Sequence, residues 1–304
     1  MSYHGVVLAK QVPDTKRITG EAMKDDGTVN RAALPAIFNP EDLHALEAAL
    51  AVRDAYGGTV TVMSMGPPRA ADILREALCR GADRAILLTD RRSAGSDTLA
   101  TSYILSCAVR HLDRVDLVFC GRQAIDGDTA QVGPQLAEKI GLPQVTYVEQ
   151  TPAIENGTLR VRRNTGHGWE RVETGLPVLL TVTDGANTPR PPAARRLMKY
   201  RRARCRFEIE QELTKALLDA PKARIAAKAD AVEADLKARG LLIEQWGLDD
   251  FEIDLGWVGL NGSPTKVNRI QSVVLKASGT QRIEPTEQGI HDLVHTLIQD
   301  HTFG

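Results

Sequence analysis

Small and polar residues that could surround a bound group are concentrated in Gly121–Pro134, the run Gly-Arg-Gln-Ala-Ile-Asp-Gly-Asp-Thr-Ala-Gln-Val-Gly-Pro. Small residues let backbone N–H groups approach a bound group closely. Thr129 and the predicted helix start can cap unpaired donors or offer them to a phosphate. Asp126 and Asp128 could accept hydrogen bonds from a ribose or from the backbone. The simpler interpretation is an Asp-Gly turn before a capped helix, because two acids suit a phosphate poorly unless they face away from it.

Three further segments have a comparable makeup, and two of them have a simple structural interpretation. Hydroxyl groups cluster in Ala94–Ser102, where Asp97 could act only as the N-cap of a helix. Ser64–Pro68 contains a glycine that permits close approach and two prolines that stiffen the turn. Phe38–Asp42 could be only a helix start. At one end of a single sheet, the four segments together favour a nucleotide site.

Motifs of other sites are absent. The sequence has no phosphate-loop GxxxxGK[ST] and no GxGxxG, and Gly95-Ser96-Asp97 lacks the spacing of a nucleophile elbow. The seven histidines form no HExxH, and no two of the four cysteines form a CxxC pair. We therefore predict no catalytic residue and no metal site. Cys107 and Cys120 lie in apolar runs and are expected to be buried thiols.

The first 150 residues alternate between strand and helix patterns. Apolar runs predict strands at 6–9, 59–63, 85–88 and 115–120. Helical spacing predicts a helix from Pro40 and others at 70–79, 97–112 and 134–140. This alternation indicates a parallel sheet with both faces covered. Ligands bind beyond the carboxyl ends of such strands, where the segments 10–15, 64–69, 89–101 and 121–134 are expected.

The pattern changes after residue 150. Alternating polar and apolar residues predict a β-hairpin at 158–173, and 177–183 is a last strand. Residues 187–192 hold three prolines and should be irregular, and eight basic residues without an acid lie between Arg190 and Arg206. This basic run could be a solvated linker or could steer an acidic partner. Further along, the sequence predicts a helical hairpin at 208–240 with Pro221 at its turn, a loop at 259–265 and a tail helix at 288–299.

Composition limits the class of protein. Hydrophobic residues make up 42% and charged residues 25% of the 304 residues, which is ordinary for a globular protein. The formal net charge of -1 gives no reason to expect nucleic-acid binding. No run approaches the roughly 18 apolar residues that span a bilayer, and the N-terminus lacks the order of a signal peptide. We expect a cytoplasmic protein without a transmembrane segment.

Five blocks closely resemble the β subunit of electron-transfer flavoproteins: Lys10–Thr15, Asn39–Asp42, Ser64–Pro68, Gly81–Ala85 and Gly121–Pro134. The resemblance covers about residues 5–200 and resumes near 246–267. The run Asp-Thr-Leu-Ala-Thr-Ser from Asp97 resembles the electron-bifurcating, FixA-like type. The family implies an α/β, Rossmann-like (adenine nucleotide α-hydrolase-like) domain, expected at 1–205, with helices on both faces and a partner-recognition segment at 187–206. A helical insertion at 206–245 and an extended C-terminal arm at 246–304, which contacts a larger α subunit, would follow.

The resemblance also implies the cofactor. In bifurcating members the β subunit holds an FAD that takes a hydride from NADH, whereas in the single-flavin type it holds AMP. We favour FAD, with AMP as the alternative, and expect NADH oxidation only in the αβ complex. Hydroxyls and N–H groups near the ring would favour reduced, anionic flavin. The implied cofactor-binding residues are Ala9, Lys10, Asn39, Asp42, Met65, Gly66, Asp97, Thr98, Thr101, Gln123, Ala124, Ile125, Asp126, Gly127, Asp128, Thr129, Ala130, Gln131, Val132, Gly133 and Pro134.

Two features depart from the family pattern. Ala194 occupies the position where the family carries a leucine that anchors a partner dehydrogenase. The helical stretch 208–240 is also longer than is usual. The redox partner, a dehydrogenase or a quinone-reducing enzyme, is therefore left open. A stress-type nucleotide sensor shares the implied fold, but the 259–265 loop and the long arm argue against it. The missing phosphate loop disfavours an adenylating enzyme.

Overall fold

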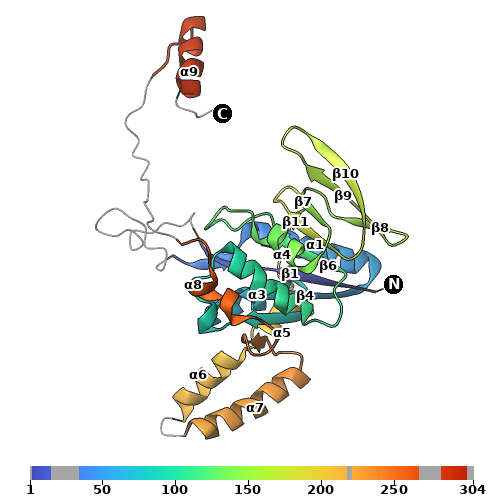
Figure 1. Ribbon diagram of the computed structural model, residues 1–304, viewed down its shortest axis with the longest axis vertical. Helices are drawn as coiled ribbons and strands as arrows, with labels where there is room; N and C mark the ends of the chain where they lie inside the picture. Colours follow the sequence, from blue (N-terminus) through green and yellow to red (C-terminus); the bar gives the residue numbers. More distant parts are fainter. Residues whose placement is uncertain (1, 15–33, 218–220, 267–281, 300–304) are drawn as a thin grey trace.

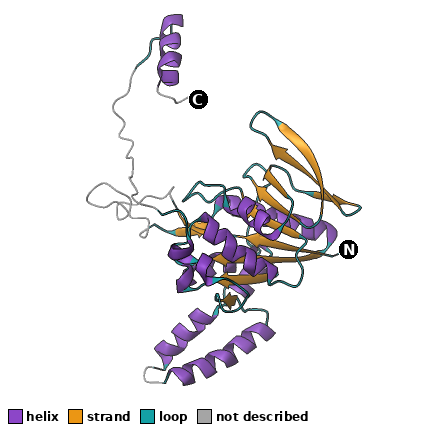
Figure 2. Cartoon of the chain, viewed as in Figure 1, coloured by secondary structure: helices purple, strands orange, loops and turns teal. Residues whose placement is uncertain are grey.

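The computed structural model of the protein describes residues 2–14, 34–217, 221–266 and 282–299. Within these ranges the chain forms one large sheet with helices on both faces, from which a β-hairpin and a pair of helices extend (Figures 1 and 2). The α/β fold class predicted from the sequence is confirmed. Thr15 and parts of the predicted arm, 267–281 and 300–304, lie outside the described residues. Among the described residues, no helix has the length and apolar character needed to cross a bilayer.

The centre of the sheet consists of parallel strands in the order β7-β11-β6-β1-β4-β5-β12. Chain order reverses beside β1: β4 and β5 extend the sheet on one side, and β6 lies on the other side. This reversal makes the gap between β1 and β6 the switch point, where ligands of open α/β sheets bind. The strands are β1 (Tyr3–Leu8), β4 (Gly58–Met65), β5 (Arg84–Leu88), β6 (Leu117–Gly121), β7 (Gln144–Val148), β11 (Val178–Val182) and β12 (Glu244–Trp246).

Side-chain alternation along the strands divides the interior into two hydrophobic cores. Val7 and Phe119 face α1 (Pro40–Tyr56) and α2 (Ala71–Arg80), whereas their neighbours Val6 and Val118 face α3 (Thr98–Arg110) and α4 (Val132–Ile140). Adjacent residues of a strand point to opposite faces, so a strand covered on both sides must be apolar throughout. The apolar runs in the sequence therefore indicated central strands correctly.

Helix boundaries follow the expected chemistry. Pro40 occupies the first turn of α1, where its missing N–H is not needed, and two acids follow it near the positive end of the helix dipole. Gly81 ends α2 and Gly141 ends α4, both at positive φ. The four cysteines are free thiols and all are buried, as expected for Cys107 and Cys120.

The outer elements agree with the sequence in most places. The predicted hairpin forms β9 and β10, and the predicted helical hairpin forms α6 and α7, with Pro221 directly before α7. The tail helix is α9, and none of its residues is buried. The bounds are β2 (Gln11–Pro13), β3 (Ala36–Phe38), β8 (Ala153–Glu155), β9 (Thr158–Asn164), β10 (Trp169–Gly175), α5 (Ala194–Tyr200), α6 (Arg206–Ala216), α7 (Lys222–Ala238), α8 (Gly259–Gly262) and α9 (Glu287–Gln299), with single 3₁₀ turns at Pro68–Ala70, Arg91–Ser93 and Leu255–Trp257.

Two sequence expectations need correction. The segment 259–265, predicted to be a loop, begins with the short helix α8, which Gly259 enters at a φ of 63°. The basic run 190–206 contains α5, whose Tyr200 is buried. Basic side chains do not prevent a helix when one face packs against another element, and α5 packs against α2.

The central packing can be tested with a matched pair of leucines. Leu46 on α1 is 1% exposed, whereas Leu197 on α5 is 48% exposed. Leu46→Ala should lower the free energy of unfolding by about 2–5 kcal/mol, because it leaves a cavity in a close-packed core. Leu197→Ala should change it by less than about 0.5 kcal/mol. Denaturant unfolding of both variants measures the difference, and equal losses would contradict the placement of α1 over the sheet.

Candidate functional site

A buried carboxylate joins the two strands on either side of the switch point. Asp42 lies in the first turn of α1 and is 6% exposed. One carboxylate oxygen accepts a hydrogen bond from the backbone N–H of Lys10, two residues beyond β1, at 2.8 Å. The other accepts from the N–H of Gly121, the last residue of β6, also at 2.8 Å. Asp42 therefore ties the start of α1 to the carboxyl ends of both strands.

Gly121 is required by this contact. A Cβ atom at residue 121 would lie 2.5 Å from an Asp42 carboxylate oxygen and 2.8 Å from the Asp42 backbone nitrogen. Gly133 is similarly confined, because a Cβ there would lie 2.7 Å from the Cys120 sulfur. Gly127 differs, since a Cβ there would meet nothing within 4 Å. Of these three glycines, Gly127 alone leaves space for another molecule to approach the backbone.

The start of α1 also holds the loop that follows β6. Asn39 precedes α1, where an asparagine side chain often caps the helix, but its amide makes no such cap. Instead it donates to the carbonyl of Gln123 at 2.9 Å and accepts from the N–H of Ile125 at 3.2 Å. Glu41 accepts from the N–H of Gln123 at 2.9 Å. Asn39 and Glu41, on either side of Pro40, thus fix the backbone around Gln123.

The two acids of the loop have partners within the protein. The Lys10 ammonium lies 2.7 and 2.8 Å from the two carboxylate oxygens of Asp126. Asp128 accepts from the side-chain amide of Gln123 at 3.0 Å. Asp128 and Ala130 have backbone φ values of 51° and 53°, which residues other than glycine seldom adopt. These contacts hold the loop in a defined and locally strained conformation.

The hydroxyl-rich segment meets the same loop from α3. The Thr98 hydroxyl donates to the side-chain carbonyl of Gln131 at 2.9 Å. Asp97 caps α3 by accepting from the N–H of Ala100 at 2.9 Å, as its simpler interpretation predicted. It also accepts from the N–H and the hydroxyl of Thr265 at 3.0 and 2.5 Å. Asp97 therefore links the start of α3 to the C-terminal part of the chain, which the sequence did not indicate.

All of the predicted site residues belong to segments at the carboxyl edge of the sheet. Side-chain contacts join Lys10 and Asn39 to the loop after β6, Asp42 to Gly121 at the end of β6, and Thr98 to the far end of the loop. No such contact joins Met65, Gly66 or Thr101 to that loop among the described residues. Ala9 and Lys10 follow β1, Met65 and Gly66 end β4, Asp97, Thr98 and Thr101 begin α3, Gln123, Ala124, Ile125, Asp126, Gly127, Asp128, Thr129, Ala130 and Gln131 form the loop, and Val132, Gly133 and Pro134 begin α4.

Sequence reasoning missed two side chains beside this loop, those of Arg122 and Tyr147. Arg122 pairs with Glu41 at 2.8 Å, and its guanidinium carbon lies 5.7 Å from the centre of the Tyr147 ring. Tyr147 is on β7, twenty-five positions along the chain, so no local pattern connects it to the loop. The position of Arg122 within the Gly121–Pro134 run was the one available signal.

The arrangement fits a nucleotide. Two buried polar atoms at the carboxyl ends of strands have no hydrogen-bond partner among the described residues: the Ser64 hydroxyl near the end of β4 and the Arg122 Nε beyond β6. Buried polar atoms of this kind normally have partners. The open side of Gly127 gives a ligand room to approach the loop backbone. Carboxylate, hydroxyl and backbone N–H groups around the loop match the ribose and phosphate groups of such a ligand.

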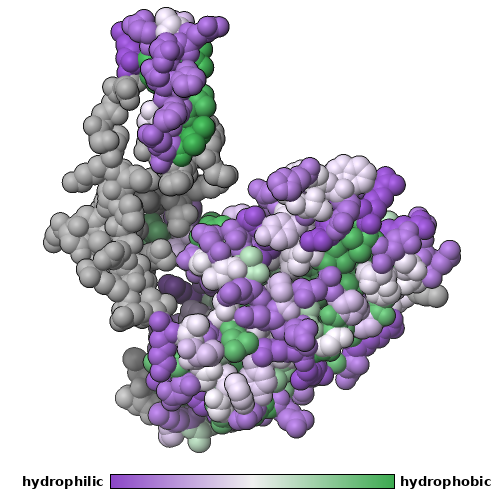
Figure 3. Space-filling view, turned by 45° about the horizontal axis from the view of Figure 1, so that its top comes forward, coloured by the Kyte–Doolittle hydropathy of each residue, from purple (hydrophilic) through white to green (hydrophobic). Residues whose placement is uncertain are grey.

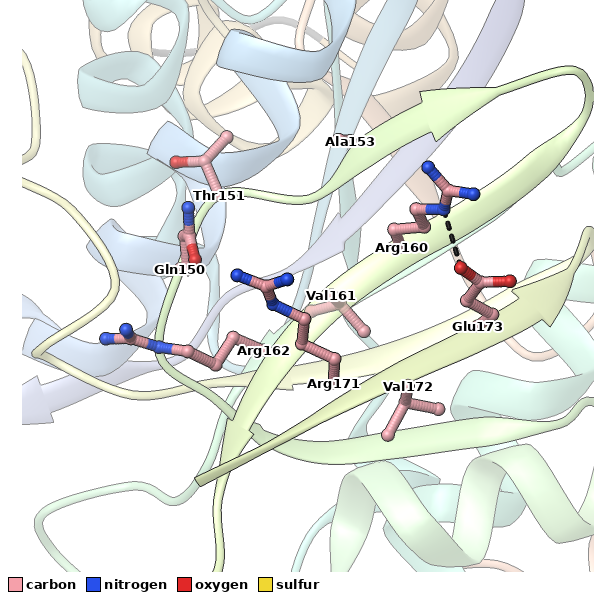
Figure 4. A pocket seen from close by; sticks show the side chains of 9 residues that line it. All are labelled: Gln150, Thr151, Ala153, Arg160, Val161, Arg162, Arg171, Val172 and Glu173. Atoms are coloured by element: carbon pink, nitrogen blue, oxygen red, sulfur yellow. Dashed lines mark hydrogen bonds and ion pairs between the residues drawn. The ribbon is translucent and has the colours of Figure 1, made fainter. Parts of the chain in front are cut away.

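A separate hollow lies on the hairpin, and its lining includes none of the predicted site residues. Figure 4 shows Arg171 directed into it beside Gln150, while Arg160 pairs with Glu173 at 2.6 Å. Arg162 and Arg171 lie directly opposite each other on β9 and β10, and both guanidinium groups lie near the ring of Trp169, at 5.5 and 5.7 Å. This is a polar surface, distinct from the carboxyl edge of β1 and β6.

The pKa of Asp42 leads to a test of its contacts with Lys10 and Gly121. Burial raises its pKa from 3.8 to about 7, although the bonds from Lys10 and Gly121 oppose this rise. A raised folded-state pKa gives stability that is complete below pH 3.8 and is lost as the pH rises through 7. The free energy of unfolding of the wild type should therefore fall relative to Asp42→Asn by about 4 kcal/mol between pH 4 and 8.

Asp97 provides the control of opposite sign. Its burial opposes ionisation, but the bonds from Ala100 and Thr265 outweigh this effect and lower its pKa below 3.8. The stability that ionised Asp97 contributes is present above that pH and is lost as the pH falls. The difference in the free energy of unfolding between the wild type and Asp97→Asn should therefore shrink only in acid. Denaturant unfolding of Asp42→Asn and Asp97→Asn across the pH range distinguishes the two effects. Parallel profiles for the wild type and Asp42→Asn would show that Asp42 does not titrate as its burial requires.

The chain matches known proteins over most of its length. Residues 26–203 match the model of the electron transfer flavoprotein domain. The chain is 40% identical over 296 residues to the electron transfer flavoprotein subunit beta of Clostridium acetobutylicum, covering 97% of this chain and 98% of the relative. Protein FixA of Bradyrhizobium diazoefficiens is 38% identical over 301 residues, covering 97% and 91%. The caffeyl-CoA reductase-Etf complex subunit CarD of Acetobacterium woodii is 50% identical over 186 residues, covering 61% and 70%. As the sequence blocks predicted, the chain belongs to the electron transfer flavoprotein β-subunit family and resembles its FixA-like members.

Proposed function

We propose that this chain is the nucleotide-holding subunit of a heterodimeric electron-transfer flavoprotein and that it binds FAD at the β1–β6 switch point. The observation that carries the proposal is the contact between Thr98 and Gln131 at 2.9 Å. This contact joins the hydroxyl-rich start of α3 to the loop that α1 positions. The site would therefore extend beyond one mononucleotide, as a dinucleotide requires. The likeness to the CarD subunit of a reductase-Etf complex supports the same assignment.

The proposed cofactor residues are those of the carboxyl edge, from Ala9 to Pro134. Asn39 and Asp42 would orient the loop, and its N–H groups with the Thr101 hydroxyl would donate to the ligand. The Thr98 hydroxyl, which donates to Gln131, could accept a hydrogen bond from it. When bound, FAD supplies the hydride and electron chemistry, with NADH as the proposed donor. The part of the chain would then be to hold the nucleotide and to favour its anionic reduced form through nearby hydroxyl and N–H donors. Electron bifurcation is the proposed use of this second flavin.

The C-terminal residues are proposed to contact the larger α subunit. The tail helix α9 exposes Ile290, Val294 and Ile298 by 57%, 44% and 54%, and Figure 3 shows hydrophobic surface along one side of this helix. An apolar stripe at helical spacing normally packs against another surface. Within the described residues this stripe has no buried member. The arm 246–304 is therefore our proposed contact with the α subunit, and 206–245 a separate helical insertion.

The segment 187–206 is proposed to recognise the redox partner, a dehydrogenase or a quinone-reducing enzyme. Ala194, at the family's anchor position, begins α5 and offers little apolar surface. Leu197 and Met198 on the same helix are 48% and 59% exposed and lie within the basic run. Apolar residues ringed by positive charge suit a partner surface that is acidic around an apolar hollow.

Cofactor stoichiometry tests the proposed function. The chain would be co-expressed with its α subunit, the complex purified and denatured, and the released FAD and AMP counted. We expect two FAD and no AMP per heterodimer, and NADH should reduce the complex. One FAD and one AMP would overturn the bifurcating assignment and leave a single-flavin carrier in which this chain is a scaffold.

A matched pair of asparagine variants shows which site holds the second nucleotide. Asn39→Ala removes both bonds to the loop and should lower the affinity for the second nucleotide by about tenfold or more. Asn164→Ala removes an exposed amide on the hairpin and should leave the count unchanged. The same count for both variants would argue against the switch point as the binding site.

A further inference from the structure

Tyr147 has a backbone conformation that its side chain disfavours. It lies on β7 with a φ of 57°, in the left-handed region that bulky residues rarely adopt. Its N–H donates to the Thr181 hydroxyl at 3.1 Å, beside a register shift between β7 and β11. Strained conformations of this kind persist where the surrounding structure enforces them, and they cluster at functional sites. A glycine or asparagine would occupy this position at lower cost.

The strained backbone places the Tyr147 ring beside Arg122. The ring is 40% exposed, and the guanidinium carbon lies 5.7 Å from its centre. A cation near the face of an aromatic ring is attracted by the ring electrons. The Arg122 backbone N–H also donates to the carbonyl of Val182 at 2.9 Å. Arg122 is therefore held from both its main chain and its side chain.

The guanidinium of Arg122 retains unused donors. One terminal nitrogen lies 2.8 Å from a Glu41 oxygen, and the Arg122 side chain is 32% exposed. Among the described residues no hydrogen bond engages its other terminal nitrogen. A guanidinium has five N–H donors in a fixed plane and binds phosphate well. Arg122 directly precedes Gln123, the first residue of the loop that α1 fixes. The unused donors thus lie at the rim of the proposed nucleotide site.

Charge at the site requires a cation in this place. The loop and the start of α1 bring together Glu41, Asp42, Asp126 and Asp128. Lys10, the one basic residue among those that the sequence predicted for the site, is paired with Asp126 at 2.7 Å. A phosphate would meet these acids without compensation if backbone N–H groups were its only partners. Arg122 adds a second positive charge at the site, and its pair with Glu41 occupies only one of its two terminal nitrogens.

We propose that Arg122 donates hydrogen bonds to a phosphate group of the nucleotide bound at the β1–β6 edge, and that Tyr147 is the positioning residue that orients it. The inference rests on the proposed function and adds the recognition of the phosphate. FAD and AMP both carry such a group. The requirement to hold Arg122 explains why a tyrosine is kept in a glycine-like conformation.

Binding of nucleotides and nucleosides to the αβ complex tests the role of Arg122. Calorimetry on nucleotide-depleted complex would compare AMP with adenosine, and FAD with riboflavin, because each pair differs by phosphate-bearing groups. Arg122→Gln should weaken the phosphate-bearing member by between about tenfold and a hundredfold, and leave the other member within about twofold. Arg122→Lys should restore part of the loss. Arg195→Gln removes an exposed guanidinium on α5 and should change neither ligand.

Three substitutions at Tyr147 separate positioning from stability. Tyr147→Phe keeps the ring and should retain phosphate-dependent affinity. Tyr147→Gly and Tyr147→Ala should lose phosphate-dependent affinity to the same extent. The glycine variant should nevertheless melt about 2–4 °C above the alanine variant, because glycine relieves the strain.

The outcomes distinguish this inference from the proposed function. Equal losses for AMP and adenosine in Arg122→Gln would mean that Arg122 only supports the loop, and the inference would be wrong. Undiminished AMP affinity in Tyr147→Gly would remove the positioning role. A wild-type complex that binds none of the four ligands would overturn the proposed nucleotide site itself, before any variant is compared.

Discussion

The carboxylate of Asp42 is the contact on which the rest of the site depends. The strands β1 and β6 are neighbours in the sheet, but the helices that follow them, α1 and α4, lie on opposite faces. The two segments of the chain therefore diverge where the strands end. Asp42 bonds the N–H of Lys10, two residues beyond β1, and the last N–H of β6, and so closes that divergence from the start of α1. The arrangement places a charge in a buried position, with a pKa raised to about 7. The sheet can thereby present a fixed loop at its switch point.

Much of this fold could be predicted from local patterns. Apolar runs identify the central strands because both faces of the sheet are covered, and Pro40 and Gly81 mark helix ends by their own backbone chemistry. The strand β12 was not predicted, because Glu-Gln-Trp contains a single apolar residue and forms a strand only by pairing with β5. That pairing joins residues about 160 positions apart, so no local sequence pattern can reveal it. The helix α5 was missed for a related reason, since its packing on α2 decides its structure.

In the candidate site, too, some features could be predicted from local patterns and others could not. Its segments could be found because small, acidic and hydroxyl residues follow apolar runs. Their roles could not be assigned, because an asparagine before a helix normally predicts a cap, whereas Asn39 bonds the loop after β6 instead. Asp97 does cap its helix, and its second role depends on Thr265, far along the chain. Tyr147 gives no local signal, because a positive φ is set by the surrounding sheet.

Asp97 also shows how the C-terminal part of the chain is connected to the site. Its backbone N–H donates to the Ser263 hydroxyl at 2.9 Å, while its carboxylate caps α3 and accepts from Thr265. Thr98, the next residue, bonds Gln131 at the end of the loop. A displacement of residues 263–265 would therefore break their bonds to Asp97 or move the start of α3 with its Thr98 hydroxyl. Residue 97 therefore joins the C-terminal segment 263–265 to the start of α3, and a change in either segment is felt by the same side chain and backbone N–H.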